Sequence, residues 1–66
     1  MDIVMNGKNV EVAGSASLLD LLELNGIDSD TVVIELNGQI IPSVEFDSVE
    51  LNNGDHLEVL RFVGGG

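Results

Sequence analysis

The chain of 66 residues is long enough for one small domain and too short for a multidomain enzyme. It contains no cysteine and a single histidine, so disulfides and a zinc site of the usual kind are excluded as stabilising elements, and a hydrophobic core has to suffice. Twelve acidic residues against only Lys8 and Arg61 give a net charge of -10, which argues against nucleic acid and anionic membranes as partners.

Two short runs rich in β-forming residues open the chain, Asp2–Met5 and Val10–Val12. Between them lies Asn6-Gly7, a dipeptide that tolerates the positive φ angles of tight hairpin turns. The pattern predicts an antiparallel hairpin at the start of the fold.

A short helix is predicted for Leu18 to Asn25. Ser17 is a typical N-cap, and Asp20 three residues later completes a capping-box pattern. Gly26 can adopt the left-handed conformation that ends many helices. The apolar residues of the helix recur at spacings of three and four, which gathers them on one stripe that should cover a sheet. These residues are Leu18, Leu21 and Leu22.

The middle of the chain contains a second pair of predicted strands. Val32–Leu36 is almost continuously apolar and rich in β-branched residues, as expected of a largely buried strand. Asn37-Gly38 then indicates another hairpin turn, which leads into Gln39–Ile41. Pro42 lacks a backbone donor, so the chain either leaves the sheet there or runs along its edge through Val44 and Phe46.

The last predicted strand runs from His56 to Val63, after a turn at residues 52–55. The order of elements predicts an α+β domain over residues 1–63, with a mixed sheet of four to five strands packed against one helix. This is the β-grasp, or ubiquitin-like, fold, here followed by a flexible tail over residues 64–66. We expect the helix stripe to meet apolar residues of the strands. The expected partners are Ile3 or Val4, Val10, Val12, Val33, Leu57 and Val59.

Leu60 and Phe62 do not fit this core. Alternate residues of an extended strand share a face, so if Leu57 and Val59 point inward, Leu60 and Phe62 lie on the outer face. Neighbouring exposed apolar groups often mark a partner surface, and these two come just before the tail. The alternative is a bulge or an edge turn that buries Phe62, and the sequence leaves both open.

The terminal glycines carry a second functional signal. Glycine has no Cβ, so Gly64-Gly65-Gly66 can pass through a channel that is too narrow for side chains. From Val63 to Gly66 the extended chain reaches roughly 13 Å, enough to enter a recessed active site while the domain docks outside. The Gly66 carboxylate is ionised at neutral pH and is a poor electrophile, so it requires activation, for example by adenylation, before a sulfur nucleophile can attack. On the residues alone, a frayed terminus or an engineered linker remains an equal alternative.

Two segments resemble one family in detail. The first is Val33-Ile34-Glu35-Leu36-Asn37-Gly38-Gln39-Ile40-Ile41-Pro42, and the second runs from Asn53-Gly54-Asp55 through Arg61-Phe62-Val63-Gly64-Gly65-Gly66. In these segments and in length the chain is similar to the ThiS-type sulfur carriers of bacterial thiamine biosynthesis. The part before Ile27 is generic to the fold. Molybdopterin-type carriers tend to be longer and to have a proline-containing lead-in, which favours the thiamine family here.

The resemblance implies roles for the tail and for three partners. An E1-like adenylyltransferase of the ThiF type would adenylate Gly66 with Mg-ATP, and persulfide sulfur from a cysteine desulfurase would convert it to a thiocarboxylate. A thiazole synthase of the ThiG type would then receive the sulfur. Gly64, Gly65 and Gly66 would enter the partner active site, and Phe62 and Val63 match the apolar lead-in of the family, so that Leu60, Phe62 and Val63 are the expected docking residues. The chain itself would bind no cofactor and contribute no catalytic residue.

Other functions have weaker support. A ubiquitin-like modifier that forms an isopeptide through Gly66, a sulfur carrier for molybdopterin or amino-acid biosynthesis, and a plain interaction module stay open, because fold alone does not separate them. His56 lacks nucleophile or metal partners at any useful spacing, so we expect a solvated residue and no metal site. No apolar run approaches the roughly 20 residues of a membrane span, and the start Met1-Asp2 is acidic, which predicts a cytoplasmic protein without a membrane partner.

Overall fold

The computed structural model describes residues 1–14 and 16–62. It contains five strands and one α-helix in the predicted order, and two short 3-10 helices that the sequence did not predict. The elements are β1 (Asp2–Met5), β2 (Lys8–Glu11), α1 (Leu18–Leu24), η1 (Ser29–Thr31), β3 (Val32–Leu36), β4 (Gln39–Ile41), η2 (Ser43–Glu45) and β5 (His56–Arg61). None of the helices in the described ranges is long and apolar enough to cross a membrane.

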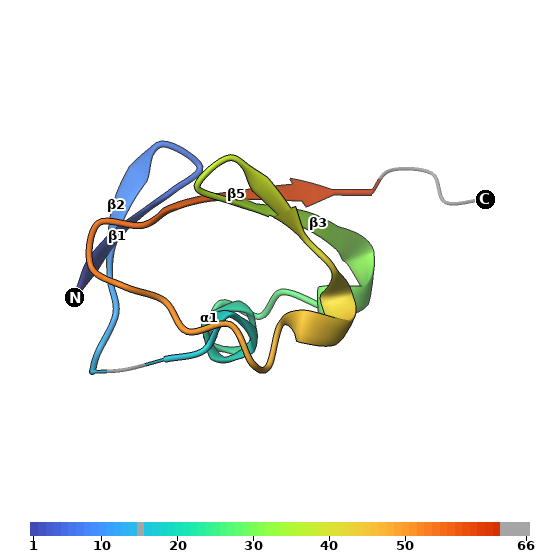
Figure 1. Cartoon of the computed structure of the whole chain (residues 1–66), viewed down its shortest axis with the longest axis horizontal. Coiled ribbons are helices and arrows are strands. Elements are labelled where there is room, and N and C mark those ends of the chain that lie inside the picture. Colours follow the sequence, from blue (N-terminus) through green and yellow to red (C-terminus); the bar gives the residue numbers. More distant parts are fainter. Residues whose placement is uncertain (15, 63–66) are drawn as a thin grey trace.

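The five strands form one mixed sheet in the order β2-β1-β5-β3-β4. The two hairpins β1-β2 and β3-β4 are antiparallel, and β5 lies between them, parallel to β1 and antiparallel to β3. Helix α1 lies across one face of the sheet, and the other face is left open to solvent (Figure 1). This arrangement is the predicted β-grasp fold, with the last strand of the chain at the centre of the sheet.

Both Asn-Gly turns have the conformation that their sequence predicts. Asn6 and Gly7 have φ angles of 51° and 81°, and Asn37 and Gly38 have 50° and 85°. Two successive positive φ angles define the type I′ turn, whose twist matches that of the flanking strands. The turn sequences therefore determine the register of both hairpins.

Helix α1 begins and ends at the predicted signals. The backbone N–H of Asp20 donates to Oγ of Ser17 at 3.0 Å, and the N–H of Ser17 donates to the carboxylate of Asp20 at 3.1 Å, which completes the capping box. At the other end, Gly26 has a φ of 67°, and the N–H of Ile27 donates to the carbonyl of Leu22 at 2.9 Å. This six-to-one hydrogen bond is that of a Schellman motif.

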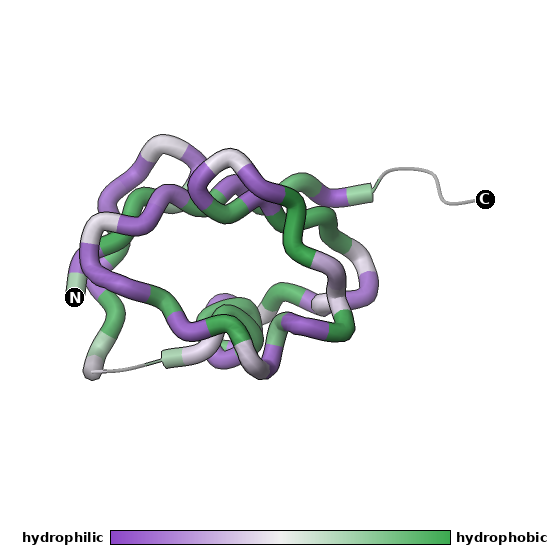
Figure 2. The backbone as a smooth tube through the Cα atoms, viewed as in Figure 1, coloured by the Kyte–Doolittle hydropathy of each residue, from purple (hydrophilic) through white to green (hydrophobic). Residues whose placement is uncertain are grey.

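One hydrophobic core fills the space between helix and sheet. Hydrophobic residues line the helix and strands that border this space (Figure 2), and buried residues alternate with more exposed ones along β3 and β5, so that one side of each strand faces the helix. The predicted leucine stripe is buried there, together with Ile3, Val12 and Leu57, while Val10 and Val59 pack against the core with partial exposure. Among the described residues, those buried are Ile3, Val12, Ala16, Leu18, Leu21, Leu22, Val32, Ile34, Phe46, Leu51 and Leu57.

The prediction of Val33 as a core residue is wrong. Val32 and Ile34 are the buried residues of β3, and Val33 is half-buried on the opposite face. The reason is that the strand is not buried on both faces, so side chains alternate between the helix side and the open side. A nearly continuous apolar run gave no information about which parity points inward.

Pro42 ends the sheet pairing, and the chain leaves the sheet instead of following its edge. The segment after it folds back under the sheet, where Phe46 is 2% exposed and fills the core. Backbone hydrogen bonds then join this segment to the start of α1, from Leu19 N–H to the Phe46 carbonyl (3.0 Å) and from Leu18 N–H to the Val49 carbonyl (2.8 Å). Residues 46–49 thus supply acceptors for the unpaired amides at the helix N-terminus.

Candidate functional site

The strand that leads to the glycine tail is hydrogen-bonded on both sides as far as Val59 and to β3 alone beyond it. On one side, the N–H of Val4 donates to the Asp55 carbonyl, and the N–H of Asn6 donates to the Leu57 carbonyl, both at 2.9 Å. On the other side, β5 pairs with β3 from Val32↔Arg61 to Leu36↔Leu57. Phe62, one residue beyond β5, still donates its N–H to the Thr31 carbonyl at 2.8 Å. The last described residue is therefore anchored to the sheet.

Two asparagine side chains add to this anchoring. Oδ1 of Asn6 accepts a hydrogen bond from the N–H of Val59 (2.8 Å), and its Nδ2 donates to the Val59 carbonyl (3.3 Å). The side chain continues the pairing with β5 at the point where β1 turns away. Sequence analysis identified Asn6 as a turn residue but missed this role, since the contact joins residues 53 positions apart.

The asparagine of the second turn acts on the start of the same strand. Oδ1 of Asn37 accepts from the N–H of His56 (2.9 Å), and its Nδ2 donates to the Asp55 carboxylate (3.0 Å). Because the two turns lie close together above β5 (Figure 1), their side chains fasten the central strand from both neighbouring hairpins. We name this pair, Asn6 and Asn37, the asparagine clamp.

Leu60 and Phe62 lie on the open face of the sheet, 53% and 58% exposed. The bulge that would bury Phe62 does not occur, so the open question about its environment is answered in favour of exposure. Leu60 is opposite Val33 in the register, and Ile40 on the edge strand is also exposed. We name Val33, Ile40, Leu60 and Phe62 the outer apolar patch.

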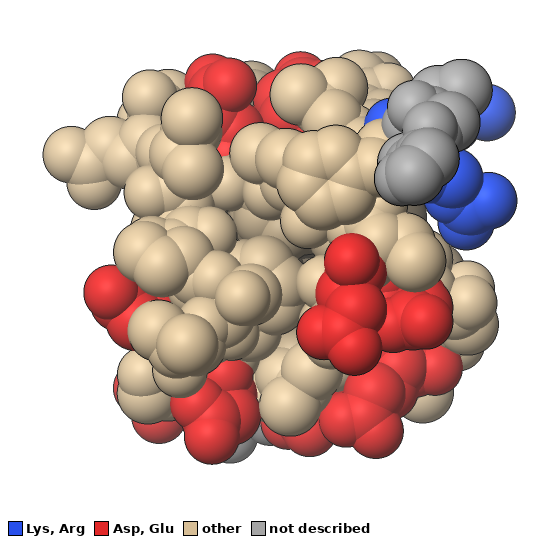
Figure 3. All heavy atoms as spheres, turned by 90° about the vertical axis from the view of Figure 1, so that its right-hand side faces the viewer, with Lys and Arg blue, Asp and Glu red and all other residues tan. Residues whose placement is uncertain are grey.

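A shallow hollow adjoins this patch. It has a volume of about 260 Å³ and is lined by three patch members, Val33, Ile40 and Phe62, together with residues of the two 3-10 helices, among them Asp30 and Ser43. Viewed from the end of the molecule at which β5 finishes, uncharged side chains cover the centre, carboxylates gather below them, and the basic side chains lie at one corner (Figure 3). Acidic and basic side chains thus lie on different sides of this end of the molecule.

Charged residues also lie on the open face itself. Glu35 of β3 is paired with Glu58 of β5 on one side and with Ile40 of β4 on the other. Two like charges in register destabilise a sheet modestly, so this pair is not explained by folding. His56 is exposed and lies on this face as well. Within residues 1–14 and 16–62, no group of His, Cys, Asp and Glu side chains is arranged to hold a metal ion.

The remaining predicted site residues, Val63, Gly64, Gly65 and Gly66, lie outside the described residues. The last strand was predicted to end at Val63, whereas β5 ends at Arg61. Leu60 and Phe62 are brought to one face with Val33 and Ile40, which sequence analysis did not assign to that face. The strand register, which no local motif predicts, decides this grouping.

Comparison with known proteins connects this geometry to a family. The model of the ThiS family matches residues 3–66. The chain belongs to the ThiS family. The match includes both segments on which the resemblance was based and extends through Gly66, so the resemblance is confirmed.

Individual ThiS relatives agree with this assignment. The chain is 35% identical over 63 residues to the sulfur carrier protein ThiS of Bacillus subtilis, with 94% of this chain and 96% of that protein covered. It is 38% identical over 66 residues to a thiazole synthase of Paramagnetospirillum magneticum, but spans only 20% of the length of that protein. The crystal structure of the thiamine biosynthesis protein ThiS from Geobacter metallireducens superposes with a TM-score of 0.86 at 35% identity, with 100% of both chains covered.

Proposed function

We propose that this chain is a sulfur carrier of thiamine biosynthesis, in which Gly66 carries the sulfur as a thiocarboxylate. The observation that supports this most directly is the ThiS-family match that extends through Gly66. The similarity to a Bacillus protein named as a sulfur carrier, over nearly the full length of both chains, points in the same direction. In this role the chain is a protein cosubstrate and not a catalyst.

The chemistry at Gly66 proceeds in three steps. A carboxylate oxygen attacks the α-phosphorus of ATP and releases pyrophosphate, which leaves an acyl-adenylate with a good leaving group. The terminal sulfur of a persulfide then attacks the glycyl carbonyl and expels AMP, which gives an acyl disulfide. A second thiol then attacks the other sulfur of this acyl disulfide, forms a new disulfide with it and releases the thiocarboxylate on Gly66. The reagents that this requires are Mg-ATP held by an adenylyltransferase of the ThiF type and a persulfide derived from a cysteine desulfurase.

The outer apolar patch is the docking surface that we assign to the adenylyltransferase. Leu60 and Phe62 are exposed on the strand that leads to the tail, and Val63 would continue the apolar lead-in toward the glycines. Glu35 and Glu58 lie beside them on the same face, so a partner with basic residues opposite these carboxylates would relieve their mutual repulsion. The anchored Phe62 would hold the start of the tail at a fixed distance from this surface.

The proposed acceptor of the sulfur is a thiazole synthase of the ThiG type. Support comes from the relative in Paramagnetospirillum magneticum, which bears the name thiazole synthase and contains a segment similar to the whole of this chain. We assign both the loading and the transfer reactions to the cytoplasm, where ATP and persulfide sulfur are available.

Intact-mass spectrometry tests the proposal. The chain is incubated with a ThiF-type adenylyltransferase, Mg-ATP, a cysteine desulfurase with cysteine, and a thiol, and a parallel sample omits ATP. We expect an ATP-dependent mass gain equal to replacement of one oxygen by sulfur, located by fragmentation at Gly66. Conjugates to other proteins would instead identify a ubiquitin-like modifier. If an active adenylyltransferase is present and neither the mass gain nor the conjugates appear, the carrier proposal is refuted.

A further inference from the structure

Strand β2 leaves one edge of the sheet open. It pairs only with β1, and the hydrogen-bonded pair between Met1 and Val12, at 2.7 Å in both directions, determines which residues face that partner. Lys8 and Val10 share this parity, so the backbone groups of Asn9 and Glu11 point away from the sheet. No residue of the described ranges forms a hydrogen bond with these outward N–H and C=O groups.

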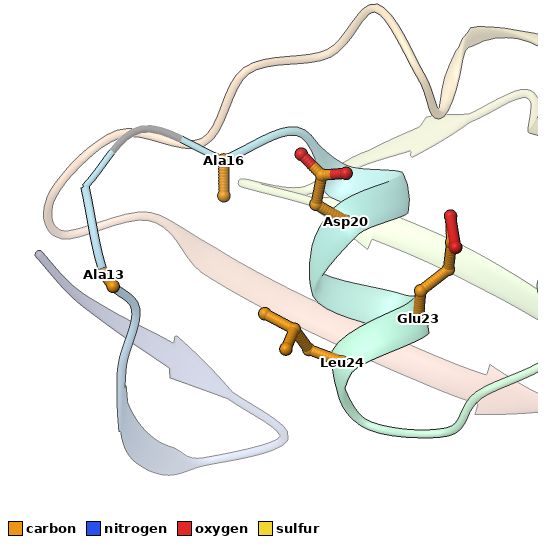
Figure 4. A pocket seen from close by; sticks show the side chains of 5 residues that line it. All are labelled: Ala13, Ala16, Asp20, Glu23 and Leu24. Atoms are coloured by element: carbon orange, nitrogen blue, oxygen red, sulfur yellow. The ribbon is translucent and has the colours of Figure 1, made fainter.

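An apolar groove runs along this edge, between β2 and helix α1. Its volume is about 330 Å³, and its walls include Val10 and Ala13 on the strand side and Leu21 and Leu24 on the helix side. Leu24 is 78% exposed although it is the last residue of an otherwise well-packed helix. In Figure 4 the Leu24 side chain projects from the helix toward the segment that carries Ala13. A large apolar group thus lies beside unpaired backbone.

Acidic residues lie at this groove and beside it. Glu11 is one of its lining residues, and the adjoining hollow along the same helix is lined by Asp20 and Glu23 in addition to Leu24. In Figure 4 the Asp20 and Glu23 side chains project from the helix in a different direction from Leu24. Lys8, at the hairpin end of β2, is the single base of this strand. The local charge beside the groove is therefore strongly negative.

The opposite edge of the sheet is different. Strand β4 has three residues, of which only Ile40 directs its backbone groups outward, and Pro42 follows immediately. A short strand that ends at a proline is a common protection against pairing with other chains. Strand β2 (Lys8–Glu11) is one residue longer and is not followed by a proline, so the groove edge is the one that another strand can join more readily, with Lys8 as its single basic residue.

We propose that the β2 edge binds an extended, basic segment of a partner protein as a sixth strand of the sheet. The backbone of the segment would bond to Asn9 and Glu11, its inward side chains would be apolar and contact Leu24, and its outward side chains would be Lys or Arg facing the carboxylates. Main-chain bonds supply affinity in this mode, and the alternating side chains supply specificity.

Charge argues for such a partner over a second copy of this chain. Two copies pairing through β2 would bring Glu11, Asp20 and Glu23 of both together, and each chain has a net charge of -10. Like charges at a contact oppose association, whereas a basic segment is attracted to the same surface. The β2 strand and the far end of β5 lie at opposite ends of the molecule (Figure 1), so the site is separate from the outer apolar patch and does not depend on the proposed function.

The test uses the full-length chain and a blocked synthetic peptide in which valine and lysine alternate. Backbone NMR spectra should show peptide-induced shifts and slower hydrogen exchange at the amides of Asn9 and Glu11. Leu24→Ala should weaken binding about tenfold, because it removes most of an apolar side chain from the contact. The matched control is Val44→Ala, which truncates a side chain that is 85% exposed on η2 and should leave the affinity unchanged.

A second variant tests the backbone contact. Asn9→Pro removes an N–H that points away from β1, so the sheet should persist while the peptide loses a hydrogen bond and binds several-fold more weakly. The proposal would be overturned if Leu24→Ala and Val44→Ala weakened peptide binding equally. It would also be overturned if the peptide-induced NMR shifts were confined to β4 or to the outer apolar patch, or if the chain dimerised through β2. Binding that Asn9→Pro leaves unchanged would overturn it as well, because a purely electrostatic contact does not require that amide.

Discussion

The two phenylalanines of this chain allow a direct comparison between a core residue and a proposed docking residue. Phe46 is 2% exposed, and Phe62 is 58% exposed on the open face. We predict that Phe62→Ala leaves the fold nearly intact and weakens binding to the adenylyltransferase. Phe46→Ala should instead destabilise the fold itself, because its ring is enclosed by helix and sheet.

The expected magnitudes differ clearly. Full burial of a phenylalanine side chain stabilises a protein by about 1.5–3 kcal/mol, so the minority of Phe62 that is buried contributes about 1 kcal/mol. Loss of a fully buried ring costs about 3–5 kcal/mol. A domain of this size has a total free energy of unfolding of about 3–10 kcal/mol, so Phe46→Ala removes much or all of its stability. Loss of a central apolar contact at an interface should weaken binding by about tenfold or more.

Urea denaturation followed by far-UV circular dichroism measures the first effect, since the chain has no tryptophan or tyrosine. Titration calorimetry with the ThiF-type enzyme measures the second. If Phe62→Ala lowers the free energy of unfolding by more than about 2 kcal/mol, Phe62 belongs to the core and the reasoning from its exposure fails. A stable variant with unchanged enzyme affinity would instead refute its role in docking.

Three further predictions concern the tail, the asparagine clamp and the paired carboxylates. Deletion of Gly66 should leave the urea midpoint unchanged and abolish thiocarboxylate formation; retained sulfur transfer would contradict the assignment of Gly66. Asn6→Gly keeps the positive φ angle available but removes two hydrogen bonds to Val59, so it should lower the free energy of unfolding by about 1–3 kcal/mol. An unchanged value would show that the clamp contributes nothing to stability. Glu58→Lys places opposite charges in register with Glu35 and should raise the free energy of unfolding by about 0.2–1 kcal/mol, while Glu45→Lys makes the same charge change away from the sheet. An equal gain in both variants would indicate a general effect of net charge.

The position of β5 explains how so small a domain can present a tail. Up to Val59 the strand is hydrogen-bonded on both sides, with the asparagine clamp acting from both hairpin turns, and pairing on the β3 side continues to Phe62. A central strand frays less readily than an edge strand, because separation of either neighbour leaves the other pairing in place. The outer apolar patch is thereby kept at a constant position relative to the residue from which the tail continues.

Local signals predicted the elements of the fold well. Ser17 and Asp20 form the expected capping box, Gly26 ends the helix, and both Asn-Gly turns are of the hairpin type. Each of these features is specified within a few residues by dihedral preference or by a nearby hydrogen bond, so the tertiary structure has little to add. The β-grasp order followed from these elements and the rules that govern their connections.

Local signals did not predict the contacts between residues that are far apart in the sequence. Phe46 was considered for the sheet edge and is instead a core residue, since Pro42 turns the chain back under the sheet. The clamp by Asn6 depends on a strand more than fifty residues later. Burial of Leu51 likewise follows from the return of residues 46–51 to the helix N-terminus, where the Leu51 N–H donates to the Ala16 carbonyl at 3.0 Å.

Strands, helix, turns and family could all be inferred from the amino-acid sequence, because these depend on local propensity and on motifs that are contiguous in the chain. The buried face of β3 could not, and it is the folded structure that brings Val33 together with Leu60 and Phe62 on the open face. An apolar strand has two similar faces that differ only in what packs against them, and the single helix of the described chain covers one face. The open β2 edge beside Leu24 likewise exists only once strand order is known.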